Sequence, residues 1–113
     1  MEENALSKIQ SNDSSSAIYK KLLDELNKFA EFEVEVKKTS LHISHGRAFL
    51  GVHPRKDGLL VNIVIDAALG GSRLKKVEKV SANRFHNEIV LSSPEELDDE
   101  LKNWLKQAYS LVS

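Results

Sequence analysis

A dense group of polar side chains occupies the run Asn83–Glu88, where one cation, one imidazole, one carboxylate and two amides surround Phe85. On a strand, His86 and Glu88 would face the same side, so His86 could act as an acid or a base while Glu88 orients it. The same residues also suit the hydrogen-bonded start of a strand, which needs no chemistry. Catalysis by His86 and Glu88 and a purely structural role are both open.

Lysine and arginine gather in the middle of the chain, where residues 37–86 hold ten of them against three acids and contain all four histidines. Residues 1–36 hold four lysines against eight acids, and residues 87–113 hold two against six, so the net charge of −1 hides a basic centre. This centre favours a negatively charged partner. The alternative is a solvated polar face, which antiparallel sheets show routinely.

The basic centre supplies groups suited to phosphate. We expect phosphate contacts from lysine and arginine, hydroxyl donation from Thr39 and Ser40, and orientation by Asn83 and His86. Phe49 would stack a base if its ring points outward. Arg73 and Lys75 reinforce the basic run, although lysines also protect edge strands from pairing. The predicted ligand-binding residues are Lys37, Lys38, Thr39, Ser40, His53, Arg55, Lys56, Lys76, Lys79, Asn83, Arg84 and His86.

Other chemistries find less support in the residues. His42, His53 and His86 are good zinc ligands by type, but their spacing matches no short metal motif, so no metal site is predicted. Glu33–Lys37 contains an acid-x-lysine pattern used by metal-dependent nucleases, without an identifiable upstream acid. The sequence has no cysteine, no phosphate-cradling glycine loop and no nucleophile elbow. No cofactor is therefore expected.

The 113 residues suit a single domain, and 41% hydrophobic against 29% charged residues permits a packed core. The longest apolar stretch, Leu59–Ile65, is far shorter than the roughly 20 residues of a membrane span. Met1–Ser7 lacks the basic start and apolar core of a signal peptide. We therefore expect a soluble cytoplasmic domain that does not enter a membrane.

Periodicity predicts the elements that position these residues. An apolar stripe from Ile18 to Phe29 predicts a helix capped by Ser15 or Ser16, while residues 1–14 resemble a polar tail or the start of a helix. Apolar and polar residues alternate, as they do in strands, over residues 31–37, 41–53, 59–65 and 85–91. Turns are expected at His45-Gly46 and Pro54–Gly58. Residues 66–72 form a loop, and residues 75–80 suit a strand slightly better than a helical turn.

The run Ser93–Glu96 has the residues of a capping box with proline at the first helical position, and an apolar stripe follows from Leu97 to Ala108. The prediction is an α+β fold of four to five mainly antiparallel strands, with an N-terminal and a C-terminal helix packed on one sheet face. Residues 15–113 would form the single domain. Its predicted core is Ile18, Leu22, Leu26, Phe32, Val34, Val36, Leu41, Ile43, Val61, Ile63, Ile89, Leu101, Trp104 and Leu105.

Four ordered motifs support a family resemblance. They are the segments 37–40, 48–56 and 75–88, and a last one formed by 93–97 with 104–105 and 108–109. In these segments the chain resembles a small bacterial family defined as a domain of unknown function, number 5655, over roughly residues 17–112. The resemblance implies a stand-alone cytoplasmic domain, or a tail on a larger protein, and no activity.

Three functions follow from these observations. The leading one is a small binding module whose basic centre recognises an anionic partner, nucleic acid or a phosphorylated ligand. The second is an enzyme that uses His86 and Glu88, with His53, on a small phosphorylated or acidic substrate. The third is a protein-interaction module with a merely solvated polar face, as a monomer or a homodimer. Binding that weakens steeply with salt would distinguish the first from the other two.

Overall fold

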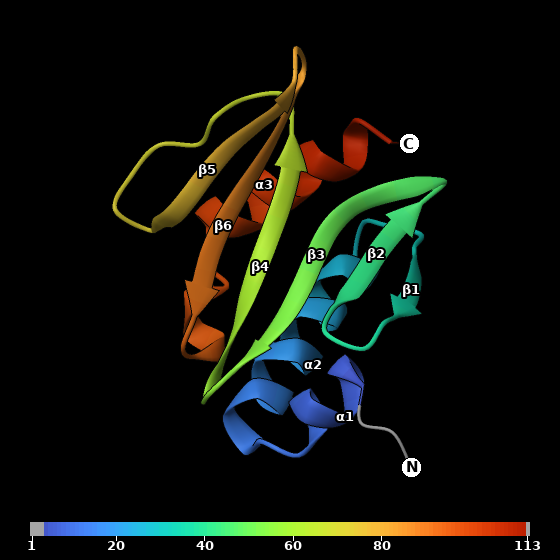
Figure 1. The fold of residues 1–113 in the computed structure, drawn as a ribbon, viewed down its shortest axis with the longest axis vertical. Helices are drawn as coiled ribbons and strands as arrows, with labels where there is room; N and C mark the ends of the chain where they lie inside the picture. The colour runs from blue at the N-terminus through green and yellow to red at the C-terminus, as the bar shows by residue number, and fades with distance from the viewer. Residues whose placement is uncertain (1–3, 113) are drawn as a thin grey trace.

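A computed structural model describes residues 4–112 as one antiparallel sheet with helices on one side (Figure 1). The strands are β1 (Glu33–Val36), β2 (Leu41–His45), β3 (Arg47–Arg55), β4 (Gly58–Ile65), β5 (Leu74–Ser81) and β6 (Arg84–Leu91). The helices are α1 (Ala5–Gln10), α2 (Asp13–Asn27) and α3 (Asp99–Ser110), with the short 3-10 helix η1 at Pro94–Glu96. The predicted α+β fold with N- and C-terminal helices is confirmed.

The sheet has six strands in the order β1-β2-β3-β4-β6-β5, so the expected count of four to five is wrong. The extra strand is β5, which covers the ambiguous segment 75–80 and pairs with β6 across a tight turn at residues 82–83. This pairing sets Lys76 opposite Glu88, and opposite charges at cross-strand positions favour a sheet. The slight preference for a strand at residues 75–80 is thus confirmed.

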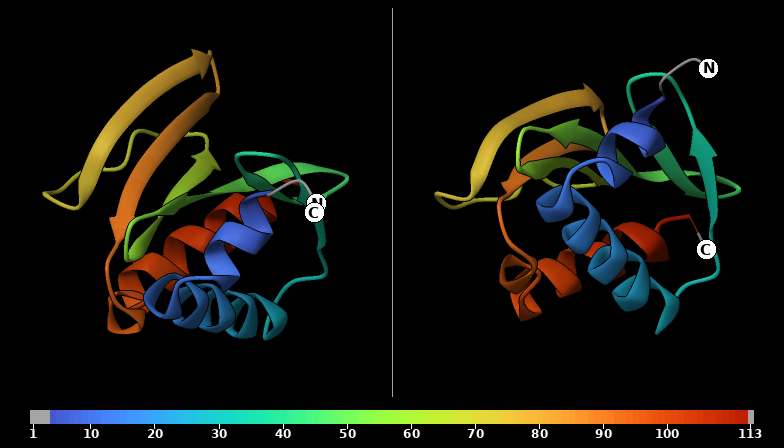
Figure 2. Two further views of the ribbon diagram at one scale, coloured as in Figure 1. Left: turned by 60° about the horizontal axis from the view of Figure 1, so that its bottom comes forward. Right: turned by 90° about the horizontal axis from the view of Figure 1, so that it is seen from below.

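The three helices cover one face of the sheet, and the other face is open (Figure 2). The β5–β6 hairpin rises away from the helices, so that the open face is concave in this view. Alternation along the strands assigns side chains to the two faces. On β4, Val61 and Ile63 are fully buried against the helices, whereas Asn62 between them faces the open side and is half-buried.

The N-terminal segment differs from the expected polar tail or helix start. Residues 5–10 form helix α1, in which Ala5 and Ile9 are fully buried in the core. Helix α2 begins at Asp13 and is capped by Asn12, which lies three residues before Ser15 and four before Ser16, the two expected caps. Ser15, one of the predicted caps, instead lies buried and donates its hydroxyl to the carbonyl of Gly58 at 2.8 Å. This contact fixes α2 against the β3–β4 turn.

Most predicted core residues are buried, but the β1 residues are not. Val34 and Val36 are 36% and 40% exposed, because β1 is the edge strand and all of its residues are exposed. Phe32 and Trp104 pack on the core and are only partly buried. The alternation over residues 31–37 correctly predicted a strand at β1. Alternation alone does not show whether other elements cover the apolar side of a strand.

A β-bulge places Phe49 in the core. Ile43 pairs with Leu50, but the next β2 residue, Ser44, pairs with Ala48, which leaves Phe49 as the extra residue on β3. Its ring is fully buried and lies edge-on to Tyr109 of α3, with ring centroids 5.5 Å apart. The outward ring that stacking of a base on Phe49 would require is therefore absent, because the bulge turns this side chain inward.

The C-terminal helix begins in two steps. The Glu96 carboxylate accepts hydrogen bonds from the backbone N–H groups of Ser92 and Ser93, at 2.8 and 3.1 Å, around the 3-10 helix. The α-helix itself starts only at Asp99, with Asp98 accepting from the backbone N–H of Leu101. The predicted helix start at Ser93 thus marks a helical turn that leads into α3.

Candidate functional site

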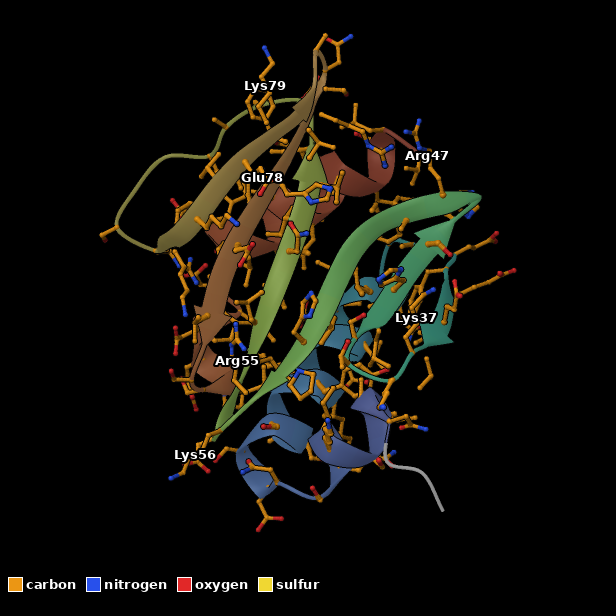
Figure 3. All side chains as sticks on the ribbon, in the orientation of Figure 1. Lys37, Arg47, Arg55, Lys56, Glu78 and Lys79 are labelled. Atoms are coloured by element: carbon orange, nitrogen blue, oxygen red, sulfur yellow. The ribbon has the colours of Figure 1, made fainter. Side chains whose placement is uncertain are left out.

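The antiparallel register spreads the predicted ligand-binding residues over the sheet from one end to the other. Figure 3 shows Arg55 and Lys56 at the end near α1 and α2, and Arg47 and Lys79 at the other end. Strand β3 runs from Arg47 to Arg55, and the eight steps of about 3.3 Å between its first and ninth residues span roughly 26 Å. The twelve predicted residues therefore do not form one cluster.

One group of predicted residues lines a polar hollow of about 560 Å³ beside α1, which we call the lower hollow. It combines the β1–β2 turn, the end of β3 and the α1–α2 junction. Its residues are Lys8, Ser11, Asn12, Thr39, His53, Pro54, Arg55 and Lys56. Thr39, His53, Arg55 and Lys56 were predicted from the sequence; Lys8, Ser11 and Asn12 were not.

Backbone and side-chain hydrogen bonds hold the walls of the lower hollow together. The N–H of Ala5 donates to the carbonyl of Lys37 at 3.0 Å, which joins α1 to the β1–β2 turn. Asn12 donates its amide to the Asp57 carboxylate at 3.0 Å, which joins the α1–α2 junction to the β3–β4 turn. Asp57 itself takes a left-handed conformation with φ 58°. The hollow is thus built by contacts between segments 32 residues (Ala5 to Lys37) and 45 residues (Asn12 to Asp57) apart in sequence.

The lower hollow has three cations without a fixed counter-ion. Lys8, Arg55 and Lys56 are exposed, and none of them forms an ion pair with any residue in 4–112. Lys37, at the near end of the β1–β2 turn, instead pairs with Glu35 at 3.2 Å. Burial, followed by the nearby charge of Arg55, lowers the pKa of His53, so this imidazole is neutral at neutral pH.

The remaining residues of the β1–β2 turn flank the lower hollow. Lys38 is exposed next to Thr39, whereas Ser40 is buried. The Ser40 hydroxyl lies 3.4 Å from Nε2 of His42 and thereby helps to position that ring. Of the four predicted residues at 37–40, Thr39 alone lines the hollow.

A second hollow, of about 300 Å³, lies at the opposite end of the sheet, and we call it the upper hollow. Arg47, Asn83 and Arg84 line it together with Asp66 and the apolar end of the chain at Leu111 and Val112. Arg84 donates to the carbonyl of Ala48 at 3.4 Å, which ties the β5–β6 turn to β3. Because Asp66 faces the two arginines, the upper hollow carries less net positive charge than the lower one.

Two other cations of the basic run, Lys76 and Arg73, are paired with acids. Lys76 pairs with Glu78 at 3.2 Å, and Lys79 is exposed at the far end of β5. Arg73 donates to the carboxylates of Asp98 and Glu100 at 2.9 and 3.2 Å, and to the carbonyl of Glu96 at 2.6 Å. The guanidinium also lies 5.9 Å from the Trp104 ring centre. Arg73 therefore joins β5 to α3 and does not extend the basic surface.

His86 and Glu88 lie on the open face, as the alternation predicts, and Asn87 between them points into the core. The Asn87 amide donates to the carbonyls of Ile63 and Ala67, both at 3.2 Å, and accepts from the N–H of Leu69 at 2.9 Å. This amide anchors the loop after β4. No hydrogen bond joins His86 to Glu88 in the described part of the chain.

A third, smaller hollow of about 120 Å³ lies between the other two on the open face, and we call it the central hollow. His42, Gly51, Asn62, Arg84 and His86 line it, together with apolar side chains. The strand register sets His42, Gly51, Asn62 and Glu88 side by side in one row across four strands. The sequence signal for this hollow was Asn62, a polar residue inside the most apolar strand.

The sequence analysis did not identify Lys8, Ser11 and Asn12 as site residues, because the first residues of the chain show little apolar periodicity.

No three His, Asp or Glu side chains within residues 4–112 are grouped so that they could hold a metal ion, and His42, His53 and His86 form no such cluster. Within the same residues no helix has the length and apolar character needed to cross a membrane.

Comparison with known proteins gives one match. Neither a curated protein nor a solved structure matches the chain. The model of one family covers residues 5–112, which includes α1, every strand and α3, and thus all three hollows. The resemblance noted in the sequence from residue 17 onward is thereby confirmed and extended to α1. The chain belongs to the family described as a domain of unknown function, DUF5655.

Proposed function

We propose that this domain binds a ligand that carries phosphate groups, and that the lower hollow holds a phosphate. The observation that carries the proposal is the meeting of Lys8, Arg55 and Lys56 without a counter-ion in residues 4–112, around a hollow of about 560 Å³. Three unpaired cations at one site attract a multiply charged anion, and arginine suits phosphate because its planar guanidinium can donate two parallel hydrogen bonds.

The other groups of the lower hollow complete a phosphate site. Thr39 offers a hydroxyl, and Asn12 offers the second N–H of an amide that is fixed by its bond to Asp57. The Ser11 hydroxyl already donates to the carbonyl of Lys8 at 2.9 Å. His53 adds a neutral ring at neutral pH, which can donate or accept a hydrogen bond without adding charge. These groups come from three separate segments that the fold holds together, so little ordering is required on binding.

The proposal is tested by fluorescence anisotropy of labelled single-stranded DNA, duplex DNA and RNA, with inorganic pyrophosphate as a competitor. We expect binding at low salt, displacement by pyrophosphate, and a loss of at least about tenfold in affinity in the double variant Arg55→Glu, Lys56→Glu. The matched control is Lys20→Glu, Lys106→Glu, which makes the same change in net charge on exposed residues of α2 and α3.

The outcome separates a site from a general charge effect. Affinity within about twofold of the wild type in the control, with a large loss in the double variant, supports a site in the lower hollow. Equal losses in both variants would show that only net charge matters. If neither the nucleic acids nor pyrophosphate bind at low salt, the proposed function is wrong.

A further inference from the structure

The central hollow contains a polar group that the described part of the protein leaves unsatisfied. Oδ1 of Asn62 is buried and has no hydrogen-bond partner within residues 4–112. A buried amide oxygen without a hydrogen-bond donor is rare in native proteins. The oxygen loses its hydrogen bonds to water when it is buried, and this costs free energy unless another donor replaces them. Asn62 lines an open hollow, so a turn of its side-chain amide toward the hollow would let a ligand with an N–H group supply the missing donor.

Gly51 makes the floor of this hollow. A Cβ atom built on Gly51 would lie 3.4 Å from Cβ of Asn62 and 3.8 Å from Nε2 of His53, so the space above Gly51 is bordered by both side chains. Asn62 and His42 are the cross-strand partners of Gly51 on its two sides. With strands about 4.8 Å apart, these two side chains start roughly 10 Å from each other and leave a slot above the glycine.

The shape and lining of the slot suit a flat ring. Its volume of about 120 Å³ equals roughly four water molecules at about 30 Å³ each, which is too small for a whole nucleotide and large enough for one planar group. His42 and His86 line it, and imidazoles are among the side chains on which unstacked bases stack. Val64 adds apolar surface at the same place.

The central hollow is continuous with the basic surfaces at both ends of the sheet. His53 lines the lower hollow and borders the slot above Gly51, and Arg84 lines both the central and the upper hollow. From Gly51 to Arg55 the strand covers about 13 Å, and stacked neighbours in one nucleic-acid strand are about 3.4 Å apart. A short run of nucleotides along β3 would therefore reach from the slot to Arg55 and Lys56.

We propose that the phosphorylated ligand is single-stranded nucleic acid, and that one base with an exocyclic amino group enters the central hollow and donates that amino group to Oδ1 of Asn62. The inference rests on the proposed function, which places phosphate in the lower hollow. Adenine and cytosine carry a suitable exocyclic amino donor, whereas thymine has an acceptor oxygen at the corresponding position and only its ring N3–H as a donor. A duplex does not fit, because its bases are paired and stacked.

The test compares labelled oligonucleotides of equal length made of deoxyadenosine, deoxycytidine or deoxythymidine. We expect the wild type to bind the adenine and cytosine strands roughly tenfold more tightly than the thymine strand. Asn62→Leu keeps the volume and removes the acceptor, so it should abolish this preference while raising the melting temperature of the free protein. Gly51→Val fills the slot and should also abolish the preference, with Ser44→Val on β2 as the control for added bulk.

A direct measurement on the wild type accompanies the variants, in case Gly51→Val does not fold. The side-chain amide signal of Asn62 in a nitrogen-15 NMR spectrum should shift when the adenine strand is added and stay in place when inorganic pyrophosphate is added. Equal affinity for the three strands, or an unchanged Asn62 signal on strand binding, would overturn the inference.

The two proposals fail differently. Pyrophosphate binding that depends on Arg55 and Lys56, without binding of any single strand, would refute the base-binding slot and leave the proposed function in place. The absence of all binding would refute both. Strand binding whose base preference persists in Asn62→Leu and Gly51→Val would refute the slot alone.

Discussion

The three unpaired cations of the lower hollow predict how binding of a single strand depends on salt. Each phosphate contact on a single strand contributes about −0.7 to the slope of log affinity against log salt. Contacts from Lys8, Arg55 and Lys56 therefore give a slope of about −2, and affinity should fall roughly twentyfold from about 50 to about 200 mM salt.

Neutralising one of these cations should change the slope by a predictable amount. In Lys56→Gln two contacts remain, so the slope becomes about −1.4 and the same rise in salt lowers affinity only about sevenfold. Lys106→Gln removes an equal charge from α3, where the ammonium lies 5.7 Å from the Phe29 ring centre, and should leave the slope at its wild-type value.

The measurement is a salt series of anisotropy titrations with one labelled single strand and the three proteins side by side. A wild-type slope near −2 that Lys56→Gln alone reduces supports three contacts in the lower hollow. An unchanged slope in Lys56→Gln, or an equal reduction in Lys106→Gln, would refute the assignment of these contacts, because binding would then follow overall charge.

Two further predictions concern His53 and Asn87. Because the pKa of His53 is lowered, mainly by burial, the imidazole gains its charge only as the pH falls below the ordinary histidine range. The affinity of the wild type for pyrophosphate relative to that of His53→Gln, a ratio in which the ligand's own protonation cancels, should therefore rise on acidification through that lowered pKa and stay constant above neutral pH. Identical pH profiles of the two proteins would contradict this. Asn87→Ala removes an amide that makes three hydrogen bonds, and it should lower the free energy of unfolding by about 3 kcal/mol in urea titrations. A loss under about 1 kcal/mol would show that other contacts anchor the loop after β4.

Local patterns in the sequence predicted most of the secondary structure. Alternation identified the strands, including β6, and glycine with positive φ marked the turn at Gly46. Apolar stripes identified α2 and α3. These signals are local because a strand repeats every two residues and a helix every 3.6, so neighbours in sequence suffice to reveal them.

Some features depend on neighbours that are distant in sequence. The bulge that turns Phe49 inward is a property of the β2–β3 pairing, and β3 by itself does not reveal it. Helix α1 is short, and Ala5 and Ile9 are buried only because the sheet and α2 lie against them. The exposure of Val34 and Val36 likewise follows from the edge position of β1.

The residues of the candidate site illustrate the same division. The sequence determined that the middle of the chain is basic and that His86 and Glu88 would share one sheet face. Only the tertiary structure decided which cations meet. Arg47 and Arg55 stand at the two ends of one extended strand and therefore lie about 26 Å apart. The folding of the chain brings Lys8 into the same hollow as Arg55. Distance along a strand grows with every residue, whereas contacts between segments depend on how the whole chain folds back on itself.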